Sequence, residues 1–206
     1  MVVVAKKDGS PRRTVDLQHL NDDKYRETHH TPHPFNHASG VPPNTRNTVL
    51  DAWNGYHSLS LAPSARDATT FITEWGRYRY LSSPQGFHAA GDGYTRAFDN
   101  ITMDVKRKTK CIDDSLLWDI NIEEAFWHTV EYITMCNSSG IVFNPKKFCF
   151  AEEEVDFAGF TLTQSGIKPM KQILDAIQNF PTPVSYTHLT LPTIVRECSS
   201  RWSPYQ

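Results

Sequence analysis

The feature that says most about this chain is the stretch Cys111-Ile112-Asp113-Asp114-Ser115-Leu116-Leu117-Trp118. It places two adjacent carboxylates at the tip of an otherwise apolar hairpin, where their charges are costly unless a cation sits between them and a substrate. A bound divalent metal would explain the pair. An ordinary acidic turn is the alternative, because Asp-Asp also occurs in such turns, and the pair alone leaves both interpretations open.

A second acid ends a short apolar segment upstream. Thr48-Val49-Leu50-Asp51 is typical of a buried strand, and the sequence Ala-Trp-Asn-Gly-Tyr-His follows it. Oxygen ligands from two neighbouring strands would hold two magnesium ions about 3.5–4 Å apart, one activating an attacking oxygen and the other stabilising a leaving one. The sequence therefore predicts a two-metal phosphoryl-transfer site held by Asp51 and Asp113.

Six blocks in order make residues 2–183 resemble the reverse transcriptase domain of a gypsy-type long-terminal-repeat retrotransposon. The blocks are Lys6-Lys7-Asp8-Gly9 with Arg12 and 15–21 (VDLQHLN); Leu50-Asp51 with Gly55-Tyr56-His57; Pro84-Gln85-Gly86-Phe87; Cys111-Ile112-Asp113-Asp114; 140–144 (GIVFN) with Lys147; and Phe157-Ala158-Gly159-Phe160.

The resemblance implies an enzyme, an RNA-directed DNA polymerase that joins a deoxynucleoside triphosphate (dNTP) to a primer 3′-hydroxyl. Asp51 and Asp113 match the family's metal-binding catalytic carboxylates, and Asp114 matches the adjacent acid, which is less directly involved in the chemistry. The implied cofactors are two Mg²⁺ ions, with Mn²⁺ as a substitute. The implied partners are an RNA or DNA template with its primer, and dNTPs.

The resemblance also assigns a nucleotide-binding set. Lys6 and Arg12 match basic residues that contact the triphosphate, although exposed hairpin charges would look the same. Tyr56 matches an aromatic ring that collides with a ribose 2′-hydroxyl, and a Tyr packed in the core is the alternative. Gln85 and Gly86 match the lining of the nucleotide pocket near the template, against the alternative of an ordinary turn.

Basic residues around the Asp pair are candidates for contacts with a nucleic-acid backbone, since phosphate contacts supply affinity without reading sequence. The formal net charge of −2 argues against a uniformly basic binding protein. Solvated surface charge is the alternative for each candidate. The candidates are Lys106, Arg107, Lys108, Lys110 and Lys147.

The pattern of residues predicts an α+β fold with helices on one face of an antiparallel sheet, which agrees with the polymerase fingers and palm that the resemblance implies. Hairpins are expected over 2–5 with 12–17 and over 70–73 with 77–81, and a loop over 28–47. Three apolar stripes at helical spacing are expected to pack in the core. They are Tyr94, Phe98 and Ile101; Ile122, Phe126, Val130 and Ile133; and Ile173, Ile177 and Phe180.

Composition indicates one domain, and the resemblance implies that residues 1–183 form a partial fingers region with the palm. The 206 residues are 39% hydrophobic and include no apolar run of membrane-spanning length. We expect an intracellular protein, cytoplasmic or nuclear, without a signal peptide or membrane partner. The oligomeric state is open.

Residues 184–206 resemble the in-frame translation of sequencing-library adapters, with 184–193 (VSYTHLTLPT) as the core of the match. We expect this segment to be a non-biological tail, and a genuine β-strand is the alternative. The thumb, connection and ribonuclease H regions of the family would follow the matched region. Two other functions therefore stay open: an inert fragment of a decayed element, and a non-catalytic nucleic-acid-binding module.

Overall fold

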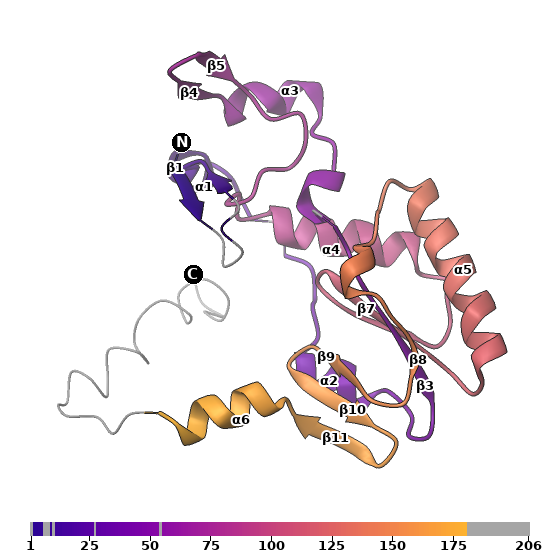
Figure 1. The fold of residues 1–206 in the computed structure, drawn as a ribbon. Coiled ribbons are helices and arrows are strands. Elements are labelled where there is room, and N and C mark those ends of the chain that lie inside the picture. The colour runs from indigo at the N-terminus through magenta and orange to yellow at the C-terminus, as the bar shows by residue number, and fades with distance from the viewer. Residues whose placement is uncertain (1, 6–8, 10, 27, 54, 181–206) are drawn as a thin grey trace. The chain divides into compact units, whose positions relative to one another are not determined.

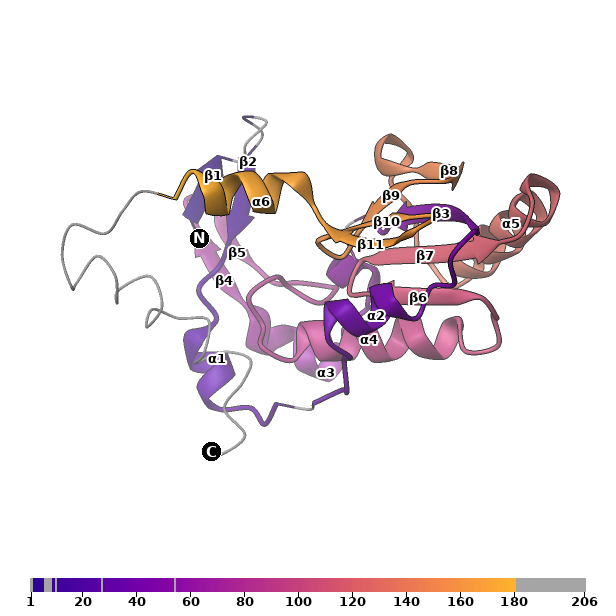
Figure 2. The ribbon, with the colours of Figure 1, turned by 90° about the horizontal axis from the view of Figure 1, so that it is seen from below.

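A computed structural model describes residues 2–5, 9, 11–26, 28–53 and 55–180, in two units that divide between Lys168 and Pro169. Figures 1 and 2 show the elements of both units. The strands are β1 (Val2–Ala5), β2 (Pro11–Thr14), β3 (Arg46–Asp51), β4 (Phe71–Thr73), β5 (Gly76–Tyr78), β6 (Lys108–Cys111), β7 (Asp114–Asp119), β8 (Cys149–Glu152), β9 (Val155–Phe157), β10 (Phe160–Thr163) and β11 (Gly166–Pro169). The α-helices are α1 (Gln18–Asp22), α2 (Pro34–Ser39), α3 (Pro63–Arg66), α4 (Ala90–Ile101), α5 (Ile122–Ser138) and α6 (Lys171–Gln178), and the 3₁₀ helices are η1 (Gly55–Ser58), η2 (Asp67–Thr69) and η3 (Pro145–Lys147).

The larger unit is built on a four-stranded antiparallel sheet with the strand order β6-β7-β3-β8. Val49 pairs with Leu116, and Thr48 pairs with Leu117. Because side chains alternate between the two faces of a strand, Val49 and Leu116 lie on one face, while Leu50 and Leu117 lie on the other. Both faces of the central strands are therefore apolar, and each one needs a cover.

Helices α4 and α5 cover the face that carries Leu50 and Leu117. Tyr94 and Phe98 of α4 and Tyr132 of α5 pack with Leu50 and Leu117 in one buried cluster. Tyr132 also donates a hydrogen bond to Ser115 Oγ, 2.9 Å away, so its buried hydroxyl is satisfied. The expected stripe on α4 and the α+β architecture are confirmed.

The opposite face is also covered, which the expectation of helices on one face did not include. Ala38 of α2 and Phe157 and Leu162 of the small sheet β11-β10-β9 pack there on Val49 and Leu116. The predicted loop over 28–47 was therefore wrong in part, because it contains α2 and the start of β3. Pro34 stands in the first turn of α2, and His33 Nδ1 accepts a hydrogen bond from the Phe35 amide at 3.2 Å.

The expected core stripe on α5 was wrong. Ile122, Phe126 and Val130 are 56%, 49% and 40% exposed, and only Ile133 packs partly against the core. The buried face instead carries Ala125, Thr129, Tyr132 and Cys136. Small residues let a helix lie close to a sheet, and a helical period by itself does not say which of two adjacent stripes turns inward.

The described part of the second unit contains α6. Its expected core residues Ile173 and Ile177 are 44% and 67% exposed, and Phe180 just beyond it is 61% exposed. The expectation that they pack in a core is thus wrong for residues 169–180, among which none is buried. The predicted adapter tail, 184–206, lies outside the described residues.

The two expected N-terminal hairpins are confirmed, with shorter second strands. β1 pairs with β2 and β4 pairs with β5, both antiparallel. Gly76 follows the turn with φ +133°, a backbone angle that residues with a side chain rarely adopt. None of the helices in the described ranges has the length and apolarity needed to cross a bilayer.

Candidate active site

Three carboxylates meet at one end of the central sheet. Asp51 is the last residue of β3 and lies directly opposite Asp114, the first residue of β7. Asp113 precedes it in the turn, and its carbonyl oxygen accepts a hydrogen bond from the Ala52 amide at 2.9 Å. The strand register therefore brings together the three acids that the sequence analysis singled out.

The turn that carries Asp113 is tight. Cys111 pairs with Asp114, so only Ile112 and Asp113 connect β6 to β7. Ile112 has φ +57°, a left-handed conformation that is costly for a β-branched side chain. Such strain persists where the surrounding structure imposes it, and it concentrates at functional sites. Here the two-residue connection between the paired strands β6 and β7 imposes it.

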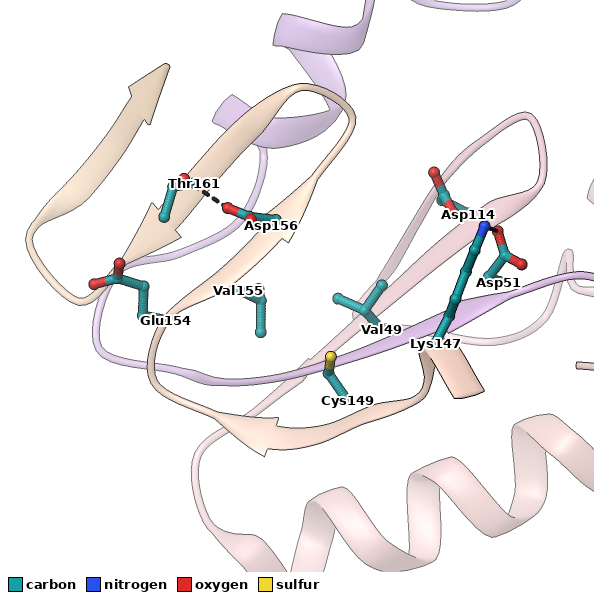
Figure 3. A pocket seen from close by; sticks show the side chains of 9 residues that line it. All are labelled: Val49, Asp51, Asp114, Lys147, Cys149, Glu154, Val155, Asp156 and Thr161. Carbon is teal, nitrogen blue, oxygen red and sulfur yellow. Dashed lines mark hydrogen bonds and ion pairs between the residues drawn. The ribbon is translucent and has the colours of Figure 1, made fainter. Parts of the chain in front are cut away.

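Lys147 reaches the carboxylates from a separate loop. The Asn144 amide donates to the Asp51 carbonyl at 2.8 Å, and Asn144 Oδ1 accepts from the Lys146 amide at 3.1 Å, which starts η3. Lys147 Nζ then lies 2.8 Å from Asp51 Oδ1 (Figure 3). This hydrogen bond raises the pKa of Lys147. A residue predicted to contact nucleic acid thus lies on the carboxylate predicted to hold metal.

The three carboxylates of the site carry more negative charge than the ammonium of Lys147 neutralises. Burial, followed by the charge of Asp51, raises the pKa of Asp113. The same two causes raise the pKa of Asp114 to about 6. Carboxylates that resist ionisation in this way are stabilised by an added cation.

One oxygen of Asp113 points away from solvent. Asp113 Oδ1 is buried without a hydrogen-bond partner among the described residues, and so is the hydroxyl of Tyr94. Gly55 makes this packing possible, because a Cβ at that position would lie 2.3 Å from Asp113 Oδ1 and 2.8 Å from Tyr94 Cζ. Real Cβ atoms do not approach so closely, so Gly55 is required by space and not by its backbone angle. The sequence analysis gave Gly55 and Tyr94 no role at the site.

A pocket of about 410 Å³ opens beside these acids, between β3, β7, η3 and the β9–β10 hairpin (Figure 3). Thr161 Oγ1 donates a 2.6 Å hydrogen bond to Asp156 across that hairpin. The lining is rich in carboxylates and holds one cationic side chain. Its residues are Val49, Asp51, Asp114, Lys147, Cys149, Glu154, Val155, Asp156 and Thr161.

The acids fit a metal that arrives with its substrate. Within the described ranges, no group of three or more His, Cys, Asp or Glu side chains forms a metal cage by itself. Magnesium in phosphoryl-transfer sites commonly binds one or two carboxylates and completes its shell with substrate phosphates and water. Asp51, Asp113 and Asp114 offer hard oxygen ligands and excess negative charge. One of their oxygens, Asp113 Oδ1, is buried without a hydrogen-bond partner among the described residues. The donor set is therefore suitable for Mg²⁺ or Mn²⁺.

The predicted nucleotide-binding residues are placed unevenly. Lys6 lies outside the described residues, and only the backbone of Arg12 is described, in β2. Tyr56 lies in η1, half-buried, with its ring edge-to-face against Tyr94 at 5.7 Å between centroids. Gln85 is half-buried beside Gly86, whose φ of +99° requires glycine.

Asn21, from one of the matched blocks, was not assigned a role and proves to hold the Pro84-Gln85-Gly86 turn. Its Nδ2 donates to the Gly86 carbonyl at 2.9 Å, and its Oδ1 accepts from the His88 amide at 3.0 Å. The Asn21 side chain, on α1, thus bonds to the backbone of both Gly86 and His88 at the end of the turn. An Asn far away in sequence gives no local signal of such a contact.

The predicted basic run is divided between surface and core. Lys106 is exposed, and Lys108 is half-buried in β6. Arg107 pairs with the buried Asp119 at 2.9 Å and with Glu124 at 2.8 Å. Lys110 is 7% exposed and its ammonium pairs with Asp99 at 3.2 Å, so the expectation that Lys110 reaches a nucleic-acid backbone does not fit its placement.

The raised pKa of Asp114 predicts a pH-dependent stability. Folded Asp114 keeps its proton up to about pH 6, whereas an unfolded Asp releases it near pH 3.8. The free energy of unfolding of the metal-free chain should therefore fall as pH rises from about 4 to 6. After allowance for partial exposure, we expect a contribution of about 1–2 kcal/mol. Urea unfolding of wild type and Asp114→Asn across this range should show a difference that varies with pH; a constant difference would contradict the expectation.

Comparison with solved structures shows which fold the chain has. No family model matches the chain. Among solved structures, foamy viral protease-reverse transcriptase in complex with double-stranded DNA matches with a TM-score of 0.85 and 21% identity, over 91% of this chain and 33% of the other. The same protein in complex with an RNA/DNA hybrid matches with a TM-score of 0.81 and 20% identity, over 93% and 26%. The fold is that of a reverse transcriptase.

The curated relatives are transposon polyproteins. The chain is 30% identical over 140 residues to a retrovirus-related Pol polyprotein from transposon 412 of Drosophila melanogaster, covering 66% of the chain and 11% of the relative. It is 25% identical over 181 residues to the Pol polyprotein of transposon opus from the same species, covering 86% and 18%. A Tf2-3 transposon polyprotein of Schizosaccharomyces pombe is 24% identical over 187 residues, covering 89% and 14%.

The homologues of this chain are thus Pol polyproteins of long-terminal-repeat retrotransposons, the gypsy type included, and its fold is the one found in a reverse transcriptase. It spans between about a tenth and a fifth of the length of these curated relatives.

Proposed function

We propose that this chain carries the fingers and palm of an RNA-directed DNA polymerase that extends a primer 3′-hydroxyl with dNTPs. The observation that carries the proposal is the register of β3 and β7, which sets Asp51 opposite Asp114 and places Asp113 beside them. The complexes of the similar foamy viral enzyme with double-stranded DNA and an RNA/DNA hybrid support a template and primer as partners.

Each residue of the site has a part in this proposal. Asp51 and Asp113 would hold two magnesium ions, and Asp114 adds charge beside them. The bound metal would supply activation of the primer hydroxyl and stabilisation of the charge on the leaving pyrophosphate. Lys147 orients Asp51 through the 2.8 Å hydrogen bond and presents an ammonium toward incoming phosphates. Tyr56, supported by Tyr94, stands under the nucleotide sugar.

A non-catalytic nucleic-acid-binding module is the weaker candidate. It would need an accessible basic face. Of the predicted basic residues, Arg107 is paired with Asp119 and Glu124, Lys110 is buried against Asp99, and Lys147 is paired with Asp51. The excess charge at the pocket is negative, which suits metal-dependent chemistry better than simple phosphate binding.

Primer extension tests the proposal directly. The purified chain is incubated with a primed RNA template, four dNTPs and Mg²⁺, and separately with a primed DNA template. We expect products whose sequence follows the template and which disappear when EDTA removes the metal. If a chain shown to be folded by circular dichroism extends neither primer, the inert-fragment alternative holds.

Tyr56 should control the choice of sugar. Replacing Tyr56 by Val removes the ring that would collide with a 2′-hydroxyl, so discrimination against ribonucleotides should fall about 10- to 100-fold. The measurement is kcat/KM for dATP and ATP in single-nucleotide extension. Tyr25→Val is the matched control, because Tyr25 is fully exposed. A Tyr56→Val variant with unchanged discrimination would show that the ring serves packing alone.

A further inference from the structure

Tyr94 stands behind the carboxylates as a fixed support. It lies on α4, is 1% exposed, and its ring packs edge-to-face on Tyr56 and tilted on Phe98, each at 5.7 Å between centroids. Contacts on both sides hold the ring in one place. The position of its hydroxyl is therefore set by the core and not by solvent.

Two unsatisfied polar atoms face the same small space. Tyr94 Oη lies 3.0 Å, and Asp113 Oδ1 2.3 Å, from the point where a Cβ would stand on Gly55. Both atoms are buried and neither has a hydrogen-bond partner among the described residues. Leaving a polar atom buried and unpaired is energetically costly. A phenol is a donor and a carboxylate is an acceptor, so each can satisfy the other.

We propose that Tyr94 is a positioning residue for Asp113. The two groups are not hydrogen-bonded in the structure, and a rotation of the Asp113 carboxylate that accompanies metal binding would let the Tyr94 hydroxyl donate a hydrogen bond to Asp113 Oδ1 and so fix the orientation of that carboxylate. The proposal rests on the proposed polymerase function. Gly55 is its structural condition, because any Cβ there would separate the two groups.

The physical advantage lies in the neutrality of the donor. Lys147 and Lys110 offset the charge of the acids, and an additional cation on Asp113 would weaken its attraction for metal. A hydroxyl fixes the orientation of the carboxylate while leaving its charge intact. Partners that orient a metal ligand in this way typically contribute 10- to 100-fold to metal affinity or activity.

Tyr94→Phe is the appropriate variant, because it removes the hydroxyl and keeps the ring that supports Tyr56 and Phe98. Tyr132→Phe is the matched control. Tyr132 is a fully buried Tyr in the same core, and its hydroxyl bonds to Ser115 instead of a carboxylate. Both variants should lose a little stability, so stability does not separate the proposal from a purely structural role.

Measurement of metal binding distinguishes a positioning role of Tyr94 from a purely structural one. Mn²⁺ is titrated into the full chain, and the free ion is measured by electron paramagnetic resonance. We expect Tyr94→Phe to raise the Kd for Mn²⁺ about 10-fold or more, and Tyr132→Phe to leave it within about twofold of wild type. In an Asp113→Asn background, Tyr94→Phe should have no further effect.

A folded Tyr94→Phe chain that binds Mn²⁺ like wild type would overturn the proposal, as would an equal loss in Tyr132→Phe. In primer extension, Tyr94→Phe should raise the Mg²⁺ concentration for half-maximal rate, with kcat at saturating Mg²⁺ largely kept. If wild type binds Mn²⁺ but extends no primer, the polymerase proposal fails, while the Mn²⁺ titrations still decide the role of Tyr94.

Discussion

Asp113→Asn is expected to abolish primer extension, lowering kcat by about 10³-fold or more, which corresponds to roughly 4 kcal/mol of transition-state stabilisation. An amide has the shape of the carboxylate without its charge, and it binds a divalent cation poorly. Asp113 also has one oxygen buried beside Gly55, so the side chain has little freedom to compensate. Single-turnover extension at several Mg²⁺ concentrations measures the loss.

The same substitution should stabilise the metal-free chain. Burial and the charge of Asp51 raise the pKa of Asp113, so at neutral pH its ionised form opposes folding. Asp113→Asn should therefore unfold at a higher temperature than wild type while being inactive. Functional sites commonly lower the stability of the folded chain when no ligand is bound to them.

Two further variants test whether the loss of activity is specific to Asp113. Asp104→Asn neutralises an exposed acid of the same unit and should change neither activity nor stability by more than a few tenths of a kcal/mol. Asp114→Asn should lose less activity than Asp113→Asn, in line with its less direct role. Equal activity of Asp113→Asn and wild type would remove Asp113 from the chemistry.

Gly55→Ala is expected to have the second largest effect. The added Cβ would lie 2.3 Å from Asp113 Oδ1 and 2.8 Å from Tyr94 Cζ, so one of them must move. Tyr94 is held by the core, and we expect Asp113 to give way. Overpacking of this kind costs about 1–3 kcal/mol of stability. Activity should fall by about 10²-fold, because displacement of a catalytic group by about 1 Å has an effect of that size.

Gly93→Ala is the matched control. Gly93 lies in α4 near the same region, and the nearest atom to an added Cβ is Leu59 Cδ1 at 4.0 Å. Alanine favours a helix over glycine by up to about 1 kcal/mol, so this variant should be slightly more stable and fully active. Primer extension and thermal unfolding of both variants make the comparison. A fully active Gly55→Ala chain would mean that the crowding at Gly55 does not constrain Asp113.

The carboxylates were predictable because their signals are local. An acid at the end of an apolar strand and an acidic pair in a hairpin stand out in a single sequence, and antiparallel pairing then brings Asp51 opposite Asp114. The inward face of α5 was not predictable in the same way. Ile122, Phe126 and Val130 have the right period, yet Ala125 and Thr129 face the sheet, because close approach of helix and sheet outweighs the size of the apolar side chains.

The supporting residues escaped prediction for a different reason. Gly55 matters because of the side chains of Asp113 and Tyr94, which come from a distant turn and a distant helix. Asn21 matters because it spans the turn around Gly86. Contacts of this kind depend on the assembled tertiary structure. The local sequence therefore indicated the candidate metal ligands but not the residues that support them.

The pairing of β7 with β3 also decides which kinds of genetic change the site tolerates. Leu116 and Leu117 are anchored in two separate cores on opposite faces of the sheet. One residue inserted between Asp114 and Leu116 would push the acids about 3.4 Å along the strand, out of line with Asp51. Single-base changes in this segment alter side chains one at a time, whereas an in-frame codon insertion alters the alignment of all three acids together. Sequences related to this chain should therefore diverge here by substitution while keeping the length of the segment constant.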